Sequence, residues 1–308
     1  MTIQQILDDD RAQLTKRSIP HMVLSSGDAS SLTPAPAQKN CPVSEGNNQA
    51  SALNRFAING NAIVTGGTGT LGLASCNALL EHGLSHLAIF DLNIASSEGT
   101  IAELQGRFPK STVMGFDVDV TDEVAVEAAV EQVSSHFGAI NHLLCFSGIV
   151  GCFDALSTPT ANWRRILDVN TTGAFICAQA VAKRMVGQQS GGSIMFTASI
   201  SAHRVNYPQP QAAYNVSKAA LITLKNCLAA EWACYGIRTN TISPGYMDTI
   251  LNEGDGIADA RRIWEERNPT GRLGAPSELT GAVVMLASSS STYINGCDIV
   301  VDGGGSAF

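Results

Sequence analysis

Short apolar runs alternate with longer amphipathic stretches along most of the chain, starting near Asn61. The runs are rich in aliphatic side chains and occupy residues 62–64, 87–90, 113–116, 143–146, 194–196, 237–242 and 299–301. Runs of this length without a clear polar face are typical of strands buried on both sides of a parallel sheet. The pattern therefore predicts seven strands.

The stretches between these runs have the spacing of helices with one apolar face. In the clearest case, a single stripe is preceded by the capping pair Thr121-Asp122 and consists of Val126, Val130, Val133 and Phe137. Repeated alternation of strands and helices predicts an α/β fold with a doubly wound, Rossmann-type, mostly parallel seven-stranded sheet. Right-handed connections place helices on both of its faces.

The first 55 residues follow no such pattern. They are rich in Ser, Pro, Ala and Asn, a composition typical of irregular segments. We therefore expect an irregular N-terminal extension over residues 1–55 and a single domain over residues 56–308.

Composition narrows the classes of function. Of the 308 residues, 44% are hydrophobic and 15% are charged, and the formal net charge is -8 without a basic block. A surface for nucleic acid or for an anionic membrane is therefore not expected. No apolar run approaches the roughly 20 residues that cross a bilayer. The N-terminus lacks the basic start and apolar core of a secretory signal.

The eight cysteines give no sign of a disulfide framework or a metal site. None forms a C-x-x-C pair, and none has a histidine at zinc-finger spacing. Most stand in apolar stretches, where a thiol acts as a small hydrophobic group. We expect reduced cysteines in a cytoplasmic protein and no metal, with a disulfide or a metal site as the alternatives.

A glycine-rich turn joins the first predicted strand to the first predicted helix, and it reads Thr65-Gly66-Gly67-Thr68-Gly69-Thr70-Leu71-Gly72. Glycines permit backbone conformations closed to other residues and let the chain approach a pyrophosphate closely. The helix that follows offers free N–H groups at its positive end. The turn therefore predicts a dinucleotide site, against the alternative of a simple loop.

Asp91 ends the second predicted strand. A carboxylate at this place can accept hydrogen bonds from both hydroxyls of the adenine ribose and would repel a 2′-phosphate. No Arg or Lys follows in residues 92–99. The sequence therefore favours NAD as cofactor, with NADP as the alternative. The plain structural interpretation is a helix-capping or solvated aspartate.

Tyr214 and Lys218 stand four residues apart, so they share one face of a helix. A nearby ammonium favours the phenolate and is expected to lower the tyrosine pKa from about 10. A lowered pKa suits proton transfer near neutral pH. Such a pair is common by chance, but this one follows the fifth predicted strand, whose end is rich in hydroxyl side chains.

Residues 57–305 resemble the short-chain dehydrogenase/reductase family over nearly a whole domain. Six segments match in order, namely the glycine-rich turn, Asp119-Val120-Thr121, Asn170 within residues 169–173, the Tyr214 and Lys218 pair, residues 244–249 and residues 301–304. The resemblance implies an NAD(P)-dependent oxidoreductase that acts on CH-OH groups and interconverts a secondary alcohol and a ketone. It also implies a homo-oligomer, either a dimer or a tetramer.

By that resemblance, Tyr214 passes a proton to or from the substrate oxygen. Lys218 binds the nicotinamide ribose and lowers the tyrosine pKa, and Asn170 supports a proton relay from Lys218. A serine stabilises the reacting oxygen. The implied cofactor contacts come from Gly66, Thr70, Leu71, Gly72, Asp91, Asp119, Val120, Gly148, Asn170, Tyr214, Lys218, Met247 and Thr249.

Two alignments with the family select different serines. The usual spacing to the tyrosine gives Ser201, whereas alignment from the strand at residues 192–199 gives Ser199. We favour Ser199, with a longer loop before Tyr214, because residues 205–211 resemble the loop of fungal sugar and polyol reductases and of related carbonyl reductases. His203 is then a loop residue at the rim of the cleft and not a base.

Two segments depart from the family's pattern. Thr70 replaces the middle glycine of the turn, and residues 145–148 read Cys-Phe-Ser-Gly where the family has Asn-Asn-Ala-Gly. A threonine hydroxyl can donate to a phosphate, so we expect altered contacts there and not lost binding. The second departure puts the geometry of the cofactor site in question.

Three functions are weighed on these observations. The first is a dehydrogenase that acts on a small-molecule alcohol or ketone, either a sugar or polyol or a secondary-metabolite alcohol, beneath a lid at residues 247–271. The second is a catalytically silent nucleotide-binding regulatory or scaffold protein. The third, a serine hydrolase, lacks a G-x-S-x-G motif. The complete set of Asn170, Ser199, Tyr214 and Lys218 favours the dehydrogenase.

Overall fold

The computed structural model describes residues 20–25, 54–252 and 254–307. The expected irregular extension lies outside these ranges except for residues 20–25, which form no helix or strand, and residues 54–55.

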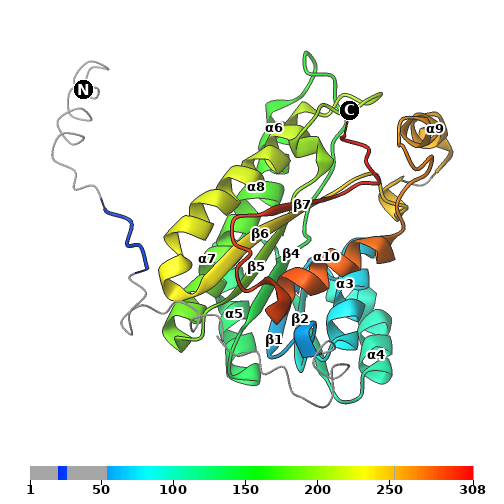
Figure 1. The fold of residues 1–308 in the computed structure, drawn as a ribbon. Helices are drawn as coiled ribbons and strands as arrows, with labels where there is room; N and C mark the ends of the chain where they lie inside the picture. The colour runs from blue at the N-terminus through cyan, green and yellow to red at the C-terminus, as the bar shows by residue number, and fades with distance from the viewer. Residues whose placement is uncertain (1–19, 26–53, 253, 308) are drawn as a thin grey trace, which may run out of the picture.

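A parallel sheet forms the centre of the described chain (Figure 1). Its seven strands are β1 (Asn61–Thr65), β2 (His86–Asp91), β3 (Thr112–Asp117), β4 (His142–Cys145), β5 (Gly192–Thr197), β6 (Ile237–Pro244) and β7 (Asp298–Val301). They lie in the order β3-β2-β1-β4-β5-β6-β7. The predicted seven-stranded, doubly wound sheet is confirmed. The chain reverses its direction of winding between β1 and β4, the place where such sheets bind ligands beyond the carboxyl ends of their strands.

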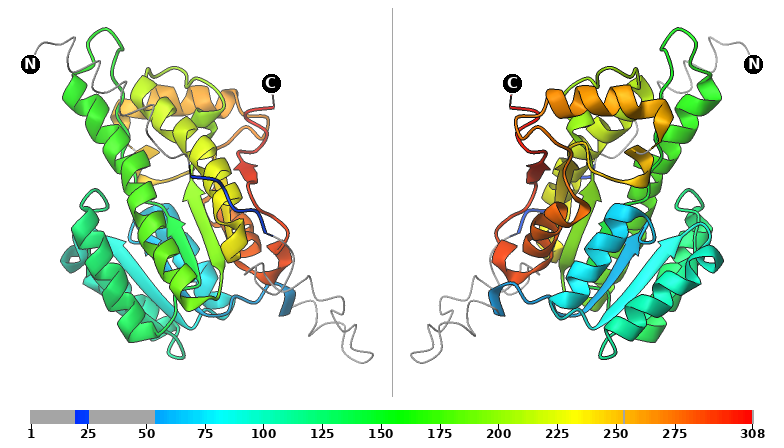
Figure 2. Two further views of the ribbon diagram at one scale, coloured as in Figure 1. Left: turned by 90° about the vertical axis from the view of Figure 1, so that its left-hand side faces the viewer. Right: turned by 90° about the vertical axis from the view of Figure 1, so that its right-hand side faces the viewer.

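Helices cover both faces of the sheet (Figure 2). One face carries α3 (Thr70–Glu81), α4 (Glu98–Arg107) and α10 (Thr280–Ala287), and the other carries α5 (Glu123–Phe137), α7 (Gly173–Gln188) and α8 (Ala212–Glu231). The short helix α6 (Thr160–Leu167) leads into α7 through one π-helical turn at Asp168–Thr172. The helix α9 (Ala258–Glu266) lies beyond the carboxyl end of the sheet (Figure 1).

The apolar stripe expected after Thr121-Asp122 forms α5. The side chain of Asp122 accepts a hydrogen bond from the Ala125 amide at 3.0 Å and so caps the first turn. Val126, Val130 and Val133 are buried against the sheet. Burial of each such side chain stabilises the fold by roughly 1.5–3 kcal/mol.

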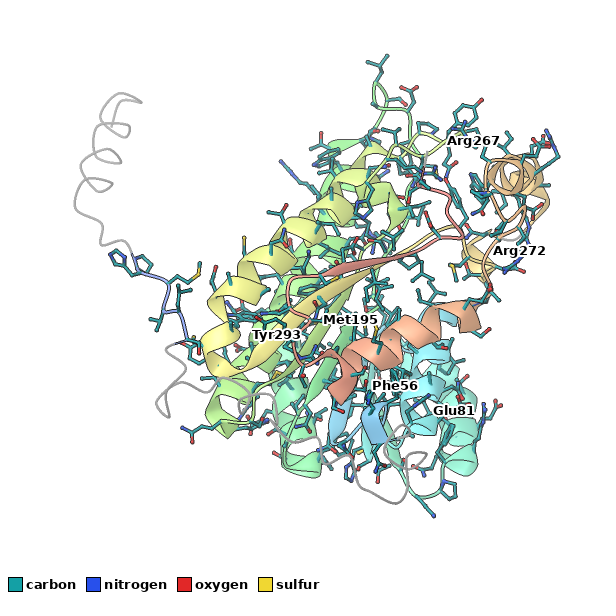
Figure 3. All side chains as sticks on the ribbon, in the orientation of Figure 1. Phe56, Glu81, Met195, Arg267, Arg272 and Tyr293 are labelled. Carbon is teal, nitrogen blue, oxygen red and sulfur yellow. The ribbon has the colours of Figure 1, made fainter. Side chains whose placement is uncertain are left out.

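The core consists of two apolar layers, one on each side of the sheet. Alternate strand residues point into opposite layers, so Ile63 joins the layer under α5 and α7 while Val64 joins the layer under α3 and α10. Met195 lies in the second layer, and its label marks the molecule's interior in Figure 3. This packing leaves the carboxyl edge of the sheet free to carry polar side chains. In the described ranges, no helix is long and apolar enough to span a membrane.

Candidate active site

A cavity of about 1560 Å³ lies along the carboxyl ends of the strands. Most of its walls are the segments that follow strands, namely residues 66–74, 91–92, 118–121, 146–150, 197–201 and 244–249. Ligand pockets usually measure about 300–1,000 Å³, so this one has room for a dinucleotide together with a substrate. Every predicted cofactor residue except Asn170 lines it.

The glycine-rich turn forms one end of the cavity. Gly66 has a φ of +64°, and a Cβ atom there would lie 2.7 Å from the Ser147 amide nitrogen. A Cβ at Gly72 would collide with the Gly66 carbonyl oxygen. Gly69 caps α3 without a side-chain bond, so the first-turn N–H groups that begin at Thr70 remain available at the cavity. Such a cradle fits a phosphate.

Asp91 is held in place beside this turn. Its Oδ2 accepts hydrogen bonds from the amide of Thr68 at 3.3 Å and from the Thr68 hydroxyl at 2.5 Å. Its Oδ1 accepts one from the Leu92 amide at 2.9 Å. Sequence reasoning missed Thr68, because no local pattern links a residue of the turn to a carboxylate 23 positions later. The carboxylate is thus fixed at the cavity wall.

Asp119 and Val120 line the cavity after β3. The Asp119 carboxylate accepts bonds from the Thr121 hydroxyl at 2.7 Å and the Thr121 amide at 2.9 Å. The hydroxyl bond is the main cause that lowers the pKa of Asp119. This segment is therefore a rigid turn with an ionised edge.

The segment after β4 keeps its course without the family's asparagines. The amide of Phe146 donates to the Thr65 carbonyl at 2.9 Å, and the amide of Ser147 donates to the Thr65 hydroxyl at 3.3 Å. Thr65, at the end of β1, thus holds the backbone against the turn. The unusual residues 145–148 are accommodated without loss of the close approach at Gly66.

Asn170 lies behind the cavity wall, in the π-helical turn between α6 and α7, and is only 1% exposed. Its Oδ1 accepts from the Ile149 amide at 2.8 Å, while its Nδ2 donates to the Ile149 carbonyl at 2.9 Å and to Ser217 Oγ at 3.0 Å. A Cβ at Gly148 would lie 3.3 Å from Asn170 Oδ1 and 3.5 Å from Lys218 Nζ. Asn170 and Lys218 therefore flank the same backbone segment.

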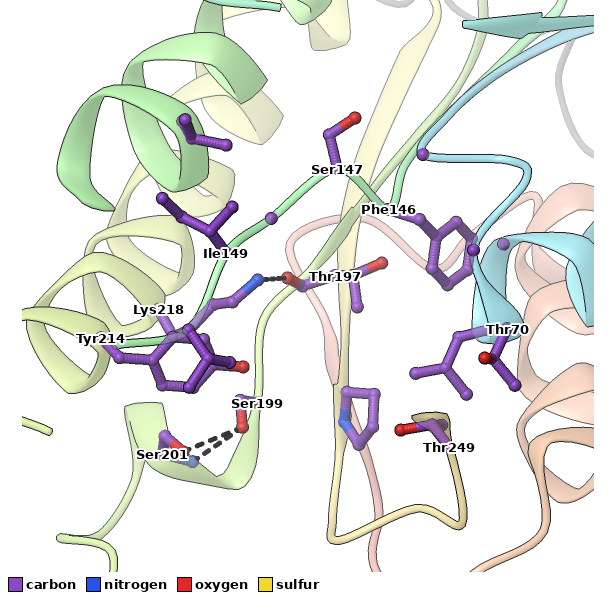
Figure 4. A pocket seen from close by; sticks show the side chains of 18 of the residues that line it. Thr70, Phe146, Ser147, Ile149, Thr197, Ser199, Ser201, Tyr214, Lys218 and Thr249 are labelled. Carbon is purple, nitrogen blue, oxygen red and sulfur yellow. Dashed lines mark hydrogen bonds between the residues drawn. The ribbon is translucent and has the colours of Figure 1, made fainter. Parts of the chain in front are cut away.

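Tyr214, Lys218 and Ser199 meet on the other side of the cavity (Figure 4). Lys218 Nζ donates to the Thr197 carbonyl at 2.7 Å and lies 5.7 Å from the centre of the Tyr214 ring. Both Ser199 and Ser201 line the cavity, and Ser199 is the serine whose hydroxyl lowers the pKa of the Tyr214 phenol. Ser201 instead holds Ser199, because its amide donates to Ser199 Oγ at 3.1 Å.

The pKa of Tyr214 differs from the sequence-based expectation. Burial raises the pKa of Tyr214 to about 12, although the Ser199 hydrogen bond lowers it. Burial also lowers the pKa of Lys218 to about 8. The expectation of a lowered tyrosine pKa was therefore wrong for the protein's own residues, without a bound cofactor. The Lys218 ammonium is itself buried and donates to a carbonyl, so desolvation of the phenol is the larger effect.

His203 is not a wall residue of the cavity. Its Nε2 lies 2.9 Å from Asp298 Oδ2 and 3.2 Å from Ser243 Oγ. These contacts fasten the loop after β5 to β7. The prediction that His203 is not a base agrees with this geometry, although the side chain lies outside the cavity and not at its rim.

Thr197 and the far end of the cavity add polar groups that sequence reasoning missed. Thr197 lines the cavity, and its hydroxyl is buried and has no hydrogen-bond partner among the described residues. Uncharged side chains line the end near the predicted lid, namely Asn206, Gln209, Gln211, Tyr246, Thr249 and Asn252. Among the described residues, no group of three or more His, Cys, Asp or Glu side chains could hold a metal ion.

The cradle, the fixed Asp91 and Lys218 in the opposite wall together fit a nicotinamide dinucleotide. Gly66, Thr70 and Gly72 would hold its phosphates. Asp91 would hold the adenine ribose, and Lys218 would lie at the nicotinamide end.

Known proteins resemble this chain over most of its length. The profile of a protein family described as enoyl-(acyl carrier protein) reductase matches residues 67–306. A D-arabinitol 2-dehydrogenase (ribulose-forming) from Scheffersomyces stipitis is 35% identical over 271 residues, covering 83% of this chain and 97% of the relative. A probable NADP-dependent mannitol dehydrogenase from Yarrowia lipolytica is 37% identical over 256 residues, covering 82% and 90%.

Solved structures agree with these relatives. The crystal structure of a short-chain type dehydrogenase/reductase from Mycobacterium marinum superposes with a TM-score of 0.77 at 35% identity, covering 83% of this chain and 99% of that one. The alternative of a catalytically silent protein is not favoured, because the relatives are named as dehydrogenases and reductases. The chain belongs to the short-chain dehydrogenase/reductase family and is an NAD(P)-dependent oxidoreductase that interconverts a secondary alcohol and a ketone.

Proposed function

We propose that this protein is an NAD-dependent dehydrogenase of polyols, which converts one secondary alcohol group of a polyol to a ketone and can run in reverse. The observation that carries the proposal is that Tyr214, Ser199 and Lys218 line the same cavity as a group of uncharged amide and hydroxyl side chains, which lie there among apolar ones such as Ile250, Ile257 and Trp264. Polyols offer many hydroxyls and no charge, so they match such a lining. The arabinitol and mannitol relatives are named for substrates of this class.

Asp91 supports NAD as the preferred cofactor. A carboxylate held by two bonds from Thr68 cannot easily turn away from the ribose. A 2′-phosphate beside it would meet a like charge. The probable mannitol dehydrogenase of Yarrowia lipolytica is named as NADP-dependent. The preference of this chain for NAD is therefore proposed from its own residues and not from that relative.

The chain's residues would divide the chemistry as follows. When bound, the nicotinamide accepts a hydride from the alcohol carbon or returns one to the ketone. Tyr214 takes the hydroxyl proton during oxidation and gives it back during reduction. Ser199 bonds the reacting oxygen, and Lys218, fixed by the Thr197 carbonyl, supports the ribose. Asn170 positions this set by holding the backbone of Ile149. Proton transfer of this kind contributes about 10²–10⁴-fold to a rate.

The test titrates the protein with NADH and NADPH separately and follows the quench of Trp fluorescence. Wild type is expected to bind NADH more tightly, and Asp91→Ala is expected to lose that preference by about ten- to hundredfold, as for hydrogen bonds to a charged group. Asp117→Ala is the matched control. Asp117 pairs with Asp91 across β2 and β3 but caps the Ile94 amide and does not line the cavity.

The same protein is then assayed for reduced nicotinamide formed from D-arabinitol and from D-mannitol. Turnover with NAD, lost in Tyr214→Phe while NADH still binds, supports the proposal. Tighter binding of NADPH by wild type would overturn the cofactor assignment. Binding of neither nucleotide would overturn the proposed function itself.

We also propose that the protein is a cytoplasmic homo-oligomer. The outer residues Val216 on α8 and Val300 on the edge strand β7 are 46% and 40% exposed, which suits contact with a second copy. The cysteines among the described residues are free thiols, which suits a reducing compartment. A monomer by light scattering at micromolar concentration would contradict the oligomer.

A further inference from the structure

Tyr246 occupies a fixed position in the cavity wall. It follows the end of β6, and its ring stacks on Trp264 of α9 with centroids 4.1 Å apart and planes 7° apart. Trp264 is only 7% exposed. Stacking on the buried indole fixes the plane of the half-buried Tyr246 ring, and with it the position of the hydroxyl oxygen.

The hydroxyl of Tyr246 receives two hydrogen bonds from the loop before α8. Gln209 Nε2 donates at 3.1 Å and Asn206 Nδ2 donates at 2.8 Å. The orientation of the Gln209 amide follows from Trp264, whose Nε1 donates to Gln209 Oε1 at 3.1 Å. An indole N–H can only donate, so Oε1 must face Trp264 and Nε2 must face Tyr246.

With the Asn206 amide oriented so that Nδ2 donates and Oδ1 is buried without a partner, the proton of the Tyr246 hydroxyl has no acceptor among the residues that the structure describes. A phenol oxygen can accept two hydrogen bonds and donate one. Both accepting positions are used by the amides, so the donating position faces the cavity that Tyr246 lines. A donor placed in this way favours an oxygen atom of a ligand.

Tyr214 and Tyr246 both line the cavity, as do Ser199 and Lys218. A substrate held by Tyr214 therefore shares this space with the Tyr246 phenol. Tyr214 exchanges the proton with the oxygen on the reacting carbon. A hydroxyl on the next carbon lies within hydrogen-bonding range of that oxygen, and Tyr246 is the side chain that can serve it.

We propose that Tyr246 is a specificity-determining residue whose hydroxyl donates a hydrogen bond to the substrate hydroxyl next to the reacting carbon. The site then selects vicinal diols, and so polyols, over simple secondary alcohols. A substrate without the second hydroxyl leaves the donor unpaired in a half-buried place, and sites built to bind a hydroxyl reject such analogues strongly. The inference rests on the proposed polyol dehydrogenase function and assigns one residue to its substrate preference.

The test compares D-arabinitol with 2-pentanol, a five-carbon secondary alcohol without a neighbouring hydroxyl, in wild type and Tyr246→Phe. The variant keeps the ring that stacks on Trp264 and loses only the hydroxyl. We expect kcat/KM for D-arabinitol to fall about ten- to hundredfold and kcat/KM for 2-pentanol to change less than about twofold. Tyr293→Phe, at a fully exposed tyrosine outside the cavity, is the matched control.

Asn206→Asp gives a second variant that leaves Tyr246 in place. A carboxylate beside the phenol accepts its proton and draws it away from the cavity. We expect kcat/KM for D-arabinitol to fall further than kcat/KM for 2-pentanol. NADH affinity is measured for each variant and should stay at the wild-type value.

Four results would overturn the inference. Equal losses on both substrates would make Tyr246 structural, and unchanged kcat/KM for D-arabinitol would remove its role in selection. Equal use of both alcohols by wild type would mean that no such selection exists. If wild type binds NADH but oxidises no polyol, the proposed function fails and the inference fails with it, which differs from an active wild type with an unaffected variant.

Discussion

The amino ends of the seven strands form one side of the sheet and their carboxyl ends form the other; these are called here the amino edge and the carboxyl edge. Both hold buried polar side chains, but those side chains have different partners. At the amino edge, Asn61 Nδ2 donates to the carbonyls of Phe137 and Ala139 at 3.0 and 2.7 Å. His142 Nε2 likewise bonds to the Asn59 carbonyl at 2.9 Å. At the carboxyl edge, Tyr214, Ser199 and Lys218 line a cavity more than six times larger than the one of about 240 Å³ at the amino edge.

A shifted pKa does not separate the two edges. Burial lowers the pKa of Lys218 to about 8 at the carboxyl edge, and it lowers the pKa of His142 to about 4 and that of Arg238 to about 10 at the amino edge. Perturbed ionisable groups are often taken as marks of function. In this fold the better mark is a polar side chain that lines the large cavity, because an unpartnered buried atom also occurs at the amino edge, at His142 Nδ1.

Helix α8 offers the sharpest test of this difference, because it carries one buried lysine at the carboxyl edge and another at the amino edge. Lys218 Nζ donates to the Thr197 carbonyl and Lys225 Nζ to the Gly296 carbonyl, both at 2.7 Å. Only Lys218 lines the cavity. Lys218→Met is expected to lower kcat/KM for polyol oxidation by about 10²–10⁴-fold. The measurement is steady-state turnover together with thermal unfolding.

Lys225→Met is the matched control, with the opposite expected signature. It should reduce stability by about 1–3 kcal/mol, because a buried carbonyl loses its donor, and turnover per folded protein should stay near wild type. Similar turnover losses in both variants would erase the distinction between the edges.

His142 tests the amino edge through pH. Its folded-state pKa of about 4 lies below the usual 6.5, so between these values the unfolded chain takes up a proton that the folded protein refuses. Stability is therefore full above pH 6.5 and falls as the pH drops towards 4. The loss reaches about 3 kcal/mol, or roughly a hundredfold in the folding equilibrium.

Thermal unfolding between pH 7 and pH 4.5 checks this expectation. The dependence of stability on pH should flatten in His142→Gln and persist in His136→Gln, which alters an exposed histidine. A wild-type slope retained in His142→Gln would assign the acid sensitivity to other groups.

What the sequence could predict was mostly local. The strand runs, the glycine-rich turn and the helical pair of Tyr214 and Lys218 depend on neighbours a few positions away, and the sheet that they predicted is confirmed. The bond between Thr68 and Asp91 joins residues 23 apart, and Tyr246, Gln209 and Trp264 join three separate segments. No periodicity carries such contacts.

The pKa of Tyr214 shows why a correct motif can give an incorrect property. The lysine four residues later was a sound reason to expect a lowered value. The phenol's burial depends on packing from several segments of the chain, and it raises the pKa to about 12. Desolvation is a property of the whole fold, so a helical spacing cannot report it.

That raised pKa predicts a difference between the two directions of the reaction. Below about 12 the phenol is mostly protonated, so reduction of a ketone has its proton donor at every pH from 7 to 9. Oxidation of an alcohol needs the phenolate, whose fraction grows by up to about tenfold per pH unit below the pKa. Profiles of kcat/KM should therefore rise with pH for oxidation only. A flat oxidation profile would mean that the pKa of Tyr214 is not raised in the complex with NAD, or that Tyr214 is not the proton acceptor.

The smallest expected effect compares two exposed thiols. Cys152 lines the cavity, and its Sγ lies 3.6 Å from Gln211 Oε1, whereas Cys227 lies on α8 outside the cavity. Methyl methanethiosulfonate adds a small group to each exposed thiol. At Cys152 the added group narrows the substrate end, so we expect KM for D-arabinitol to rise a few-fold with little change in kcat.

Burial raises the pKa of Cys152, and the thiolate is the reactive form, so modification should quicken as the pH rises. The assay is run in a Cys41→Ser background, with Cys152→Ser and Cys227→Ser compared. The rise in KM should be absent in Cys152→Ser and when polyol is bound during modification, and it should remain in Cys227→Ser. This result would place the substrate at the carboxyl edge. If both variants prevented the rise in KM equally, the rise would not come from a group added inside the cavity, because Cys227 does not line the cavity.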